Sequence, residues 1–156
     1  MEKLTREEII RWGCNWSYSC HCLFREGKEK SKKEEAIRRH RELWNKIAEL
    51  CTGKFSVYEI KYVAFEALGY DDPDEFPDSM CWACEYANYN AIRLHGTNKG
   101  ICCFCPIKWK TEVCYDKGGE YDMWGRYMRD GNYEKAAEMA RVIANLPEKK
   151  EVKEHD

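Results

Sequence analysis

The chain has 156 residues, of which 44% are hydrophobic, 13% aromatic and 35% charged. This length suits one compact domain or two small ones, and the apolar share is sufficient for a core. The high charge argues against a membrane protein, since no apolar run approaches the roughly 20 residues that a transmembrane helix needs. Residues 1–10 lack the apolar segment of a secretory signal, so we expect a cytoplasmic protein.

The net charge of −2 conceals a segregation along the chain. Residues 1–62 hold 14 basic and 10 acidic side chains, residues 63–90 hold seven acidic and no basic ones, and residues 91–156 hold 12 basic and 11 acidic ones. A nucleic-acid-binding protein of uniformly basic character would not show this pattern. The acidic band is densest at 71–78, DDPDEFPD, which we expect to be a loop because two prolines interrupt it.

Capping boxes and apolar spacing predict most of the helices. The first helix is short and spans about 6–12. Ser31 and Glu34 form a box that opens a longer helix ending near Gly53, and Ser56 and Glu59 open a helix to about 68. Further helices are predicted over 87–95, over 121–128 and, with Asn132 as the cap, over 133–145. Residues 101–107, ICCFCPI, are expected to be a short extended run.

The apolar stripes of two of these helices predict the core. Trp44 and Ile47 recur at helical spacing on the helix that follows Ser31. Ala140 and Ile143 line one side of the last helix. We therefore expect Trp44 and Ile47 to be buried against the last helix, near these two residues.

The ten cysteines include two pairs with metal-ligand spacing. Each pair, Cys81/Cys84 and Cys102/Cys105, has two intervening residues, and 17 residues separate the pairs. Four thiolates at this spacing are typical of a tetrahedral Zn²⁺ site. A filled four-thiolate site has no position for water or substrate, so it is structural. The alternatives are disulfides or buried inert thiols, and an iron–sulfur cluster.

The ligand set stays open at this point. Either Cys103 or Cys114 can replace one of the four thiols of the two pairs. Cys14, Cys20 and Cys22 form a second group, which would hold another ion together with Cys51, His21 or His40. Their spacing matches no familiar motif. The alternatives are a buried cluster of thiols and partial sharing with the first site.

These features predict a mainly α fold, organised around a zinc knuckle or ribbon-like site of four cysteines, with little or no β-structure. Residues 1–30 are interpreted as an added cysteine-containing element, residues 31–147 as a zinc-stapled helical domain, and residues 148–156 as a charged tail. No internal repeat is present.

Enzymatic motifs are missing from the sequence. None of the four histidines lies in a nucleophile or metalloprotease motif, and neither a phosphate-binding loop nor a dinucleotide-binding fingerprint occurs. We therefore expect a non-enzymatic protein that works through protein–protein interaction. A nucleic-acid-binding zinc module is the alternative, with the basic residues near Arg38 meeting phosphates, although glutamates are interleaved with them.

Several segments carry a family resemblance. They are, in order, HRELWNKIAEL at 40–50, CWACEYA at 81–87, CFCPIKW at 103–109, Cys114, YDMW at 121–124 and AAEMARVIANLP at 136–147. With them the chain resembles a family of small cysteine-rich proteins encoded in phages and prophages, which has no agreed biochemical role. The chain departs from the family's C-x-x-C-P motif in having one more cysteine at 102–105, and residues 1–30 look like an addition.

The resemblance implies a zinc-binding phage accessory protein in the cytoplasm of the host cell. Phage accessory proteins of this size often block host defences. We therefore expect the chain to bind a host protein that processes nucleic acid, and to inhibit a defence effector such as a CRISPR nuclease.

The sequence also suggests where such a partner would bind. Acidic side chains would steer a basic partner, and aromatic side chains of the N-terminal element would supply apolar anchors. The acidic residues are Asp71, Asp72, Asp74 and Glu75, and the aromatic ones are Trp16, Tyr18 and Phe24. The alternative is that the acidic loop only maintains solubility.

Overall fold

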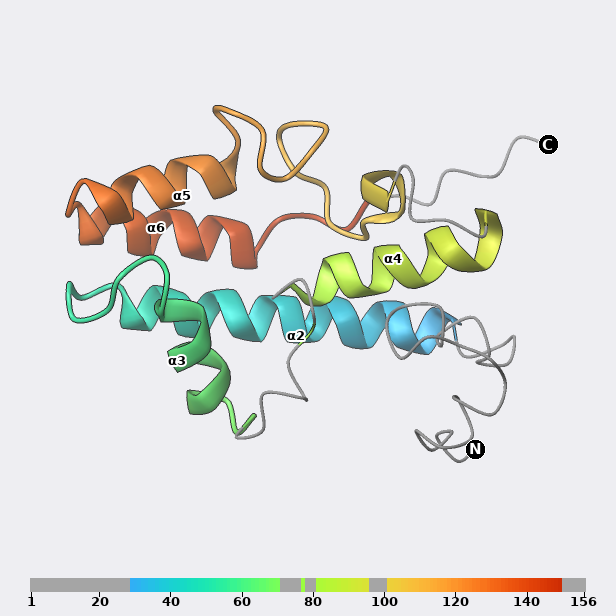
Figure 1. Cartoon of the computed structure of the whole chain (residues 1–156), viewed down its shortest axis with the longest axis horizontal. Helices are drawn as coiled ribbons and strands as arrows, with labels where there is room; N and C mark the ends of the chain where they lie inside the picture. The colour runs from blue at the N-terminus through green and yellow to red at the C-terminus, as the bar shows by residue number, and fades with distance from the viewer. Residues whose placement is uncertain (1–28, 71–76, 78–80, 96–100, 150–156) are drawn as a thin grey trace.

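The computed structural model describes residues 29–70, 77, 81–95 and 101–149 (Figure 1). Within these ranges the chain forms five α-helices and one short 3-10 helix. They are α2 (Glu29–Leu50), α3 (Ile60–Ala67), α4 (Trp82–His95), η3 (Ile101–Phe104), α5 (Glu120–Arg129) and α6 (Tyr133–Ala144). These residues contain no strand, and an isolated antiparallel bridge joins Ile107 to Glu148. The prediction of a mainly α protein is confirmed.

The long helix α2 organises the fold (Figure 1). Helices α6, α4 and α3 each pack against it, α5 packs on α6, and η3 packs on α4. Helix α6 and helix α4 lie along different parts of α2, one after the other. None of the helices described by the structure is both long and apolar enough to span a membrane.

The larger core lies where α2, α3, α5 and α6 meet. Trp44 and Ile47 of α2 share one buried apolar cluster with Ala140 and Ile143 of α6, so all four residues are buried in one core, as predicted. Trp44 is only 2% exposed and stands edge-on to Trp124, with 5.0 Å between ring centroids. Such aromatic pairs contribute about 0.5–1.5 kcal/mol beyond the area that they bury.

A smaller core joins the first half of α2 to the cysteine-rich segments. Ile37 of α2 and Ala83 of α4 are buried together with Cys105 and Ile107, and partly buried side chains, among them Cys81 and Trp109, pack against them. The cysteine-rich segments are therefore attached to α2 by apolar packing.

The ends of the helices follow the predicted capping signals with small shifts. Helix α2 begins two residues before Ser31. The backbone N–H of Ser56 donates to the Glu59 carboxylate at 2.8 Å, but α3 begins only at Ile60, because a turn occupies residues 57–59. Asn132 accepts a hydrogen bond from the backbone N–H of Lys135 at 3.3 Å and caps α6 as predicted.

Gly53 follows α2 at a position that only glycine fits. Its φ of +88° lies in the left-handed region that side chains with a Cβ rarely adopt. An added Cβ would also lie 2.8 Å from the Tyr133 ring. The predicted end of the helix near Gly53 is therefore confirmed, with Leu50 as the last helical residue.

Two of the secondary-structure predictions concern the segments that carry the cysteine pairs. The helix predicted over 87–95 is confirmed but begins earlier, at Trp82. The extended run predicted over 101–107 is wrong, since residues 101–104 form η3. The N–H of Cys105 donates to the carbonyl of Cys102 at 3.3 Å, so the pair lies on a tight turn, which Pro106 then ends.

The predicted charged tail starts inside the folded part of the chain. The N–H of Lys108 donates to the carbonyl of Pro147 at 2.9 Å, and the N–H of Lys149 donates to the carbonyl of Pro106 at 2.7 Å. Glu148 also forms an ion pair with Lys33 of α2 at 3.0 Å. The remainder of the tail, the predicted helix over 6–12 and almost all of residues 71–78 lie outside the described residues.

Candidate metal centre

The two cysteine pairs belong to elements that pack on each other. Cys81 directly precedes α4 and Cys84 lies in its first turn. Cys102 lies in η3, Cys105 follows it, and η3 packs against α4. The N-terminus of a helix carries a partial positive charge, which favours thiolates at the positions of Cys81 and Cys84.

Cys84 lies between two other sulfurs. It hydrogen-bonds to Cys114 and to Cys81, and both contacts raise the pKa of Cys84. The same contact with Cys84 lowers the pKa of Cys114, and it lowers the pKa of Cys81 well below its ordinary value. Cys114, one of the two possible substitute ligands, is therefore a neighbour of the first pair. A metal ion would deprotonate all three thiols, whatever their pKa without it.

A buried histidine adjoins these sulfurs. His40 of α2 is only 1% exposed, and its ring interacts with Cys81, which further lowers the pKa of that thiol. Its Nε2 lies 3.2 Å from the carbonyl oxygen of Ile143 in α6. The ring also stands edge-on to Trp109, with 5.9 Å between centroids. His40 thus lies where the two cores adjoin.

Cys105 lies in a more apolar environment. Burial raises the pKa of Cys105 to about 11, while the backbone of Ile107 and the indole of Trp109 act in the opposite direction. Charge on Cys81 and Cys114 also raises it, so these sulfurs are electrostatic neighbours. The indole nitrogen of Trp109 is buried without a close hydrogen-bond partner. A thiolate nearby would be a suitable acceptor for this N–H.

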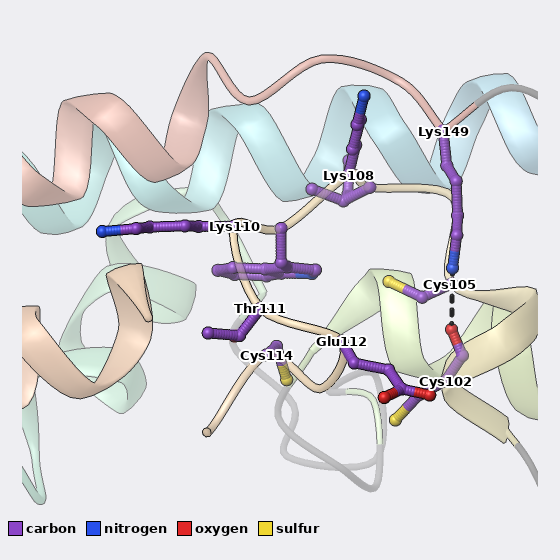
Figure 2. A pocket seen from close by; sticks show the side chains of 10 residues that line it. Cys102, Cys105, Lys108, Lys110, Thr111, Glu112, Cys114 and Lys149 are labelled. Carbon is purple, nitrogen blue, oxygen red and sulfur yellow. Dashed lines mark hydrogen bonds between the residues drawn. The ribbon is translucent and has the colours of Figure 1, made fainter. Parts of the chain in front are cut away.

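Three of the cysteines line one cavity of about 330 Å³. Figure 2 shows Cys102, Cys105 and Cys114 around it, together with Lys108, Lys110 and Lys149. The amine of Lys149 donates to the backbone carbonyl of Cys102 at 3.2 Å. The second pair and Cys114 therefore share a cavity, while Cys114 also contacts the first pair.

The sulfurs are neighbours and do not form a closed coordination shell. Among the residues that the structure describes, no group of three or more His, Cys, Asp or Glu side chains is placed so that it could hold a metal ion. None of the six cysteines whose state is described takes part in a disulfide. Reduced thiols that adjoin one another are the chemistry that Zn²⁺ prefers, and binding would draw them together.

Cys51 lies apart from this group. Cys51 directly follows α2, and its thiol donates to the carbonyl of Ile47 in the last turn of that helix at 3.1 Å. Burial raises its pKa, and Trp124 and Arg141 oppose this. These contacts are typical of a thiol in an apolar core. The second metal site predicted from Cys51 with Cys14, Cys20 and Cys22 stays a prediction, since those three residues lie outside the described part.

Other predicted site residues are also outside the part of the chain that the structure describes. This holds for the acidic residues Asp71, Asp72, Asp74 and Glu75 and for the aromatic residues Trp16, Tyr18 and Phe24. The backbone of Cys103 belongs to η3, and its side chain is not described.

Sequence reasoning did not connect His40 with the paired cysteines. A signal was present, because His40 continues the apolar stripe of α2, three residues after Ile37 and four before Trp44. A polar residue at a buried helical position needs a polar partner. Local spacing does not identify that partner, because the partner is distant from His40 in the sequence.

Comparisons with protein-family models, with curated proteins and with solved structures give no match for this chain. A function is therefore proposed from the chain's own residues, from their geometry and from the family resemblance.

Proposed function

We propose that this chain is a non-enzymatic, zinc-binding phage accessory protein that binds a host protein and inhibits a defence effector such as a CRISPR nuclease. The zinc site is supported by one observation above all. Cys84 is a neighbour of Cys81 and Cys114, and Cys102, Cys105 and Cys114 line one cavity, so five cysteines from the start of α4, from η3 and from the segment after it gather in one part of the fold. The phage origin and the defence target are supported by the family resemblance alone.

The proposed zinc is structural. Four protein ligands at about 2.0–2.3 Å would fill its coordination sphere and leave no place for a substrate. Binding of such an ion contributes on the order of 10 kcal/mol to folding. Residues 105–119 contain no regular helix, and Cys105 and Cys114 both belong to this segment. A metal ion would therefore hold a segment that has few backbone hydrogen bonds of its own.

A protein partner is supported by exposed aromatic side chains next to the acidic segment. Tyr58 is 83% exposed in the turn that precedes α3, and Tyr62 is 51% exposed within α3. Tyrosine is enriched in protein interfaces, where its ring supplies a large contact area. Helix α3 ends at Ala67, and three residues separate it from the acidic segment 71–78, so apolar anchors and acidic charge lie close together along the chain.

The nucleic-acid alternative has less support from the basic helix. Arg38 forms an ion pair with Glu42 at 2.7 Å, and Arg39 forms one with Glu35 at 2.7 Å. These pairs lie within α2 and offset the positive charge that phosphates would need. The arrangement favours a solvated helix face over a phosphate-binding one.

The proposal is tested by capture of the partner from bacterial cells. The tagged chain should retain one host protein in a stoichiometric complex, and nuclease treatment should not release it. Replacing Tyr58 and Tyr62 with alanine should weaken capture, whereas Tyr115→Ala, which is 70% exposed on another segment, should leave it unchanged. Binding to DNA or RNA with a steep salt dependence, and to no protein, would support the alternative instead.

A further inference from the structure

One side of helix α3 faces away from the protein core. The opposite side is buried in the larger core through apolar side chains. Helical hydrogen bonding begins one turn before α3, since the N–H of Ile60 donates to the carbonyl of Ser56 at 3.0 Å. Tyr58, Tyr62 and Glu66 therefore recur every four residues along one side of the helix, and all three are exposed. These three residues form the α3 outer face.

The α3 outer face has no basic side chain to offset its carboxylate. Lys61 is the only basic residue in 55–92. Its amine lies 4.8 Å from the centroid of the Tyr121 ring and 5.5 Å from that of the Trp44 ring, so it points toward the core side of α3. Among the residues that the structure describes, no ion pair includes Glu66. The α3 outer face thus combines two aromatic rings with an uncompensated negative charge.

The position of Glu66 does not serve the stability of the helix. Glu66 lies in the last turn of α3, where the helix has no basic residue. The C-terminal end of a helix carries a partial negative charge, so a carboxylate there is repelled and a cation is attracted. A positive group supplied from outside the chain would offset both the charge of Glu66 and that of the helix end.

An arginine elsewhere in the chain shows how one side chain contacts both a ring and a carboxylate. The guanidinium of Arg39 forms an ion pair with Glu35 at 2.7 Å and lies over the Trp82 ring, 4.6 Å from its centroid. Arginine suits both contacts because its flat face stacks on a ring while its edge donates to a carboxylate, whereas a lysine ammonium is a point charge. Residues 62 and 66 lie one helical turn apart, with about 5–6 Å between Cβ atoms, so one guanidinium can reach both.

We propose that the α3 outer face docks an arginine-rich segment of the partner, whose guanidinium groups stack on Tyr58 and Tyr62 and bond to Glu66. This inference rests on the proposed function for the existence of a host protein partner, and it specifies the chemistry of the contact. Charge complementarity selects this occupant. A second copy of the chain docked through the same face would bring the same negative charge, and nucleic acid would bring phosphates, so both are repelled.

A labelled peptide of alternating arginine and serine is the first probe, with the full-length chain and fluorescence anisotropy as the readout. The comparison peptide has lysine in place of every arginine and carries the same charge. The arginine peptide should bind about 2–5-fold more tightly, because a guanidinium gains more from stacking on exposed rings and from a two-point bond to a carboxylate. Equal affinities would show attraction by charge alone and would overturn the proposal.

Two substitutions locate the bound peptide on α3. Glu66→Gln and Tyr62→Leu should each weaken binding of the arginine peptide by about 2–5-fold, the range expected for one exposed ion pair or one cation–π contact. The matched controls are Glu138→Gln on α6 and Tyr115→Leu before α5, which are both exposed and should leave the affinity unchanged. Equal losses in the controls, or no loss in the α3 variants, would overturn the proposal.

The thermal midpoint separates a binding role of Glu66 from a folding role. Glu66→Gln should raise the midpoint slightly while it weakens peptide binding, because it removes a charge that the end of the helix repels. A lowered midpoint would show that Glu66 supports the fold of its own chain, and would overturn its assignment to a partner contact.

Capture from bacterial cells distinguishes failure of this inference from failure of the proposed function. If no host protein is captured while the arginine peptide still binds at α3, the proposed function fails and the arginine-binding surface stands. If one host protein is captured equally by the unaltered chain and by the double variant with Tyr62→Leu and Glu66→Gln, the host partner stands and this inference is overturned.

Discussion

Individual side chains connect distant parts of this chain through buried contacts. Trp44 of α2 packs edge-on against both Trp124 and Tyr121 of α5. Asp122, in the same helix as these partners, accepts a hydrogen bond from the N–H of Gly118 at 2.9 Å and forms an ion pair with Arg126 at 3.2 Å. The first contact is apolar and the second is electrostatic, so substitutions should affect them in different ways.

Trp44→Ala should lower the free energy of unfolding by about 3–5 kcal/mol, because it leaves a cavity in the larger core. Denaturant unfolding followed by circular dichroism measures this change. Val142→Ala is the control, since Val142 is 47% exposed and should change the free energy by less than about 0.5 kcal/mol. A loss below about 1 kcal/mol for Trp44→Ala would contradict its place in a packed core.

Asp122 should make stability depend on pH in the acidic range. The N–H of Gly118, followed by the charge of Arg126, lowers the pKa of Asp122 from its ordinary value of 3.8. A carboxylate whose pKa is lower in the folded state stabilises the fold above its unfolded pKa, and this contribution is lost as the pH falls through the folded pKa.

Asp122→Asn should therefore reduce stability at neutral pH, and the difference from the unaltered protein should disappear under acid. Thermal midpoints measured between neutral and strongly acidic pH give the comparison. A difference that stays the same at every pH would show that the charge of Asp122 does not contribute.

At the scale of elements, local signals explain most helices. The apolar stripe of α2, the carboxylate contact of Glu59 and the Asn132 cap are all sequence-local, so 29–50, 60–67 and 133–144 were predicted with errors of a few residues. The 3-10 helix η3 was not predicted. Its geometry depends on packing against α4 and on Pro106, and an apolar run such as ICCFC is compatible with either conformation.

The cap of α6 is the sharpest local signal. Asn132→Ala removes the acceptor for the Lys135 N–H and should lower the free energy of unfolding by about 1 kcal/mol. Asn132→Ser should restore most of it, because a hydroxyl also caps well. Equal stability of the alanine and asparagine proteins in denaturant titrations would show that the bond contributes nothing.

Some residues of the candidate site are indicated by a local sequence pattern, and others become neighbours only through packing. The C-x-x-C spacing indicated Cys81 and Cys84, since two ligands on one turn are a local pattern. The contact of Cys84 with Cys114 and that of Cys81 with His40 join residues 30 and 41 positions apart in the sequence. Only the packing of α2, α4 and the segment between η3 and α5 brings them together, and spacing alone carries no information about it.

At the scale of the whole molecule, the two cores should respond differently to metal removal. The larger core contains none of the five clustered cysteines, whereas Cys105 and Cys81 belong to the smaller one. A chelator should therefore increase hydrogen exchange in α4 and η3 while α6 and the second half of α2 stay protected. A uniform increase over all helices would contradict this division.

The central claim is that the adjoining thiols hold a metal ion. Its most direct test is the metal content of the protein, purified without added zinc and measured by mass spectrometry. The proposed site predicts about one zinc per chain, bound tightly enough to survive dialysis. Cys84→Ser should abolish it and Cys51→Ser should not, because Cys84 contacts two other sulfurs and Cys51 lies in the larger core. A folded protein that contains no zinc above background would contradict the claim.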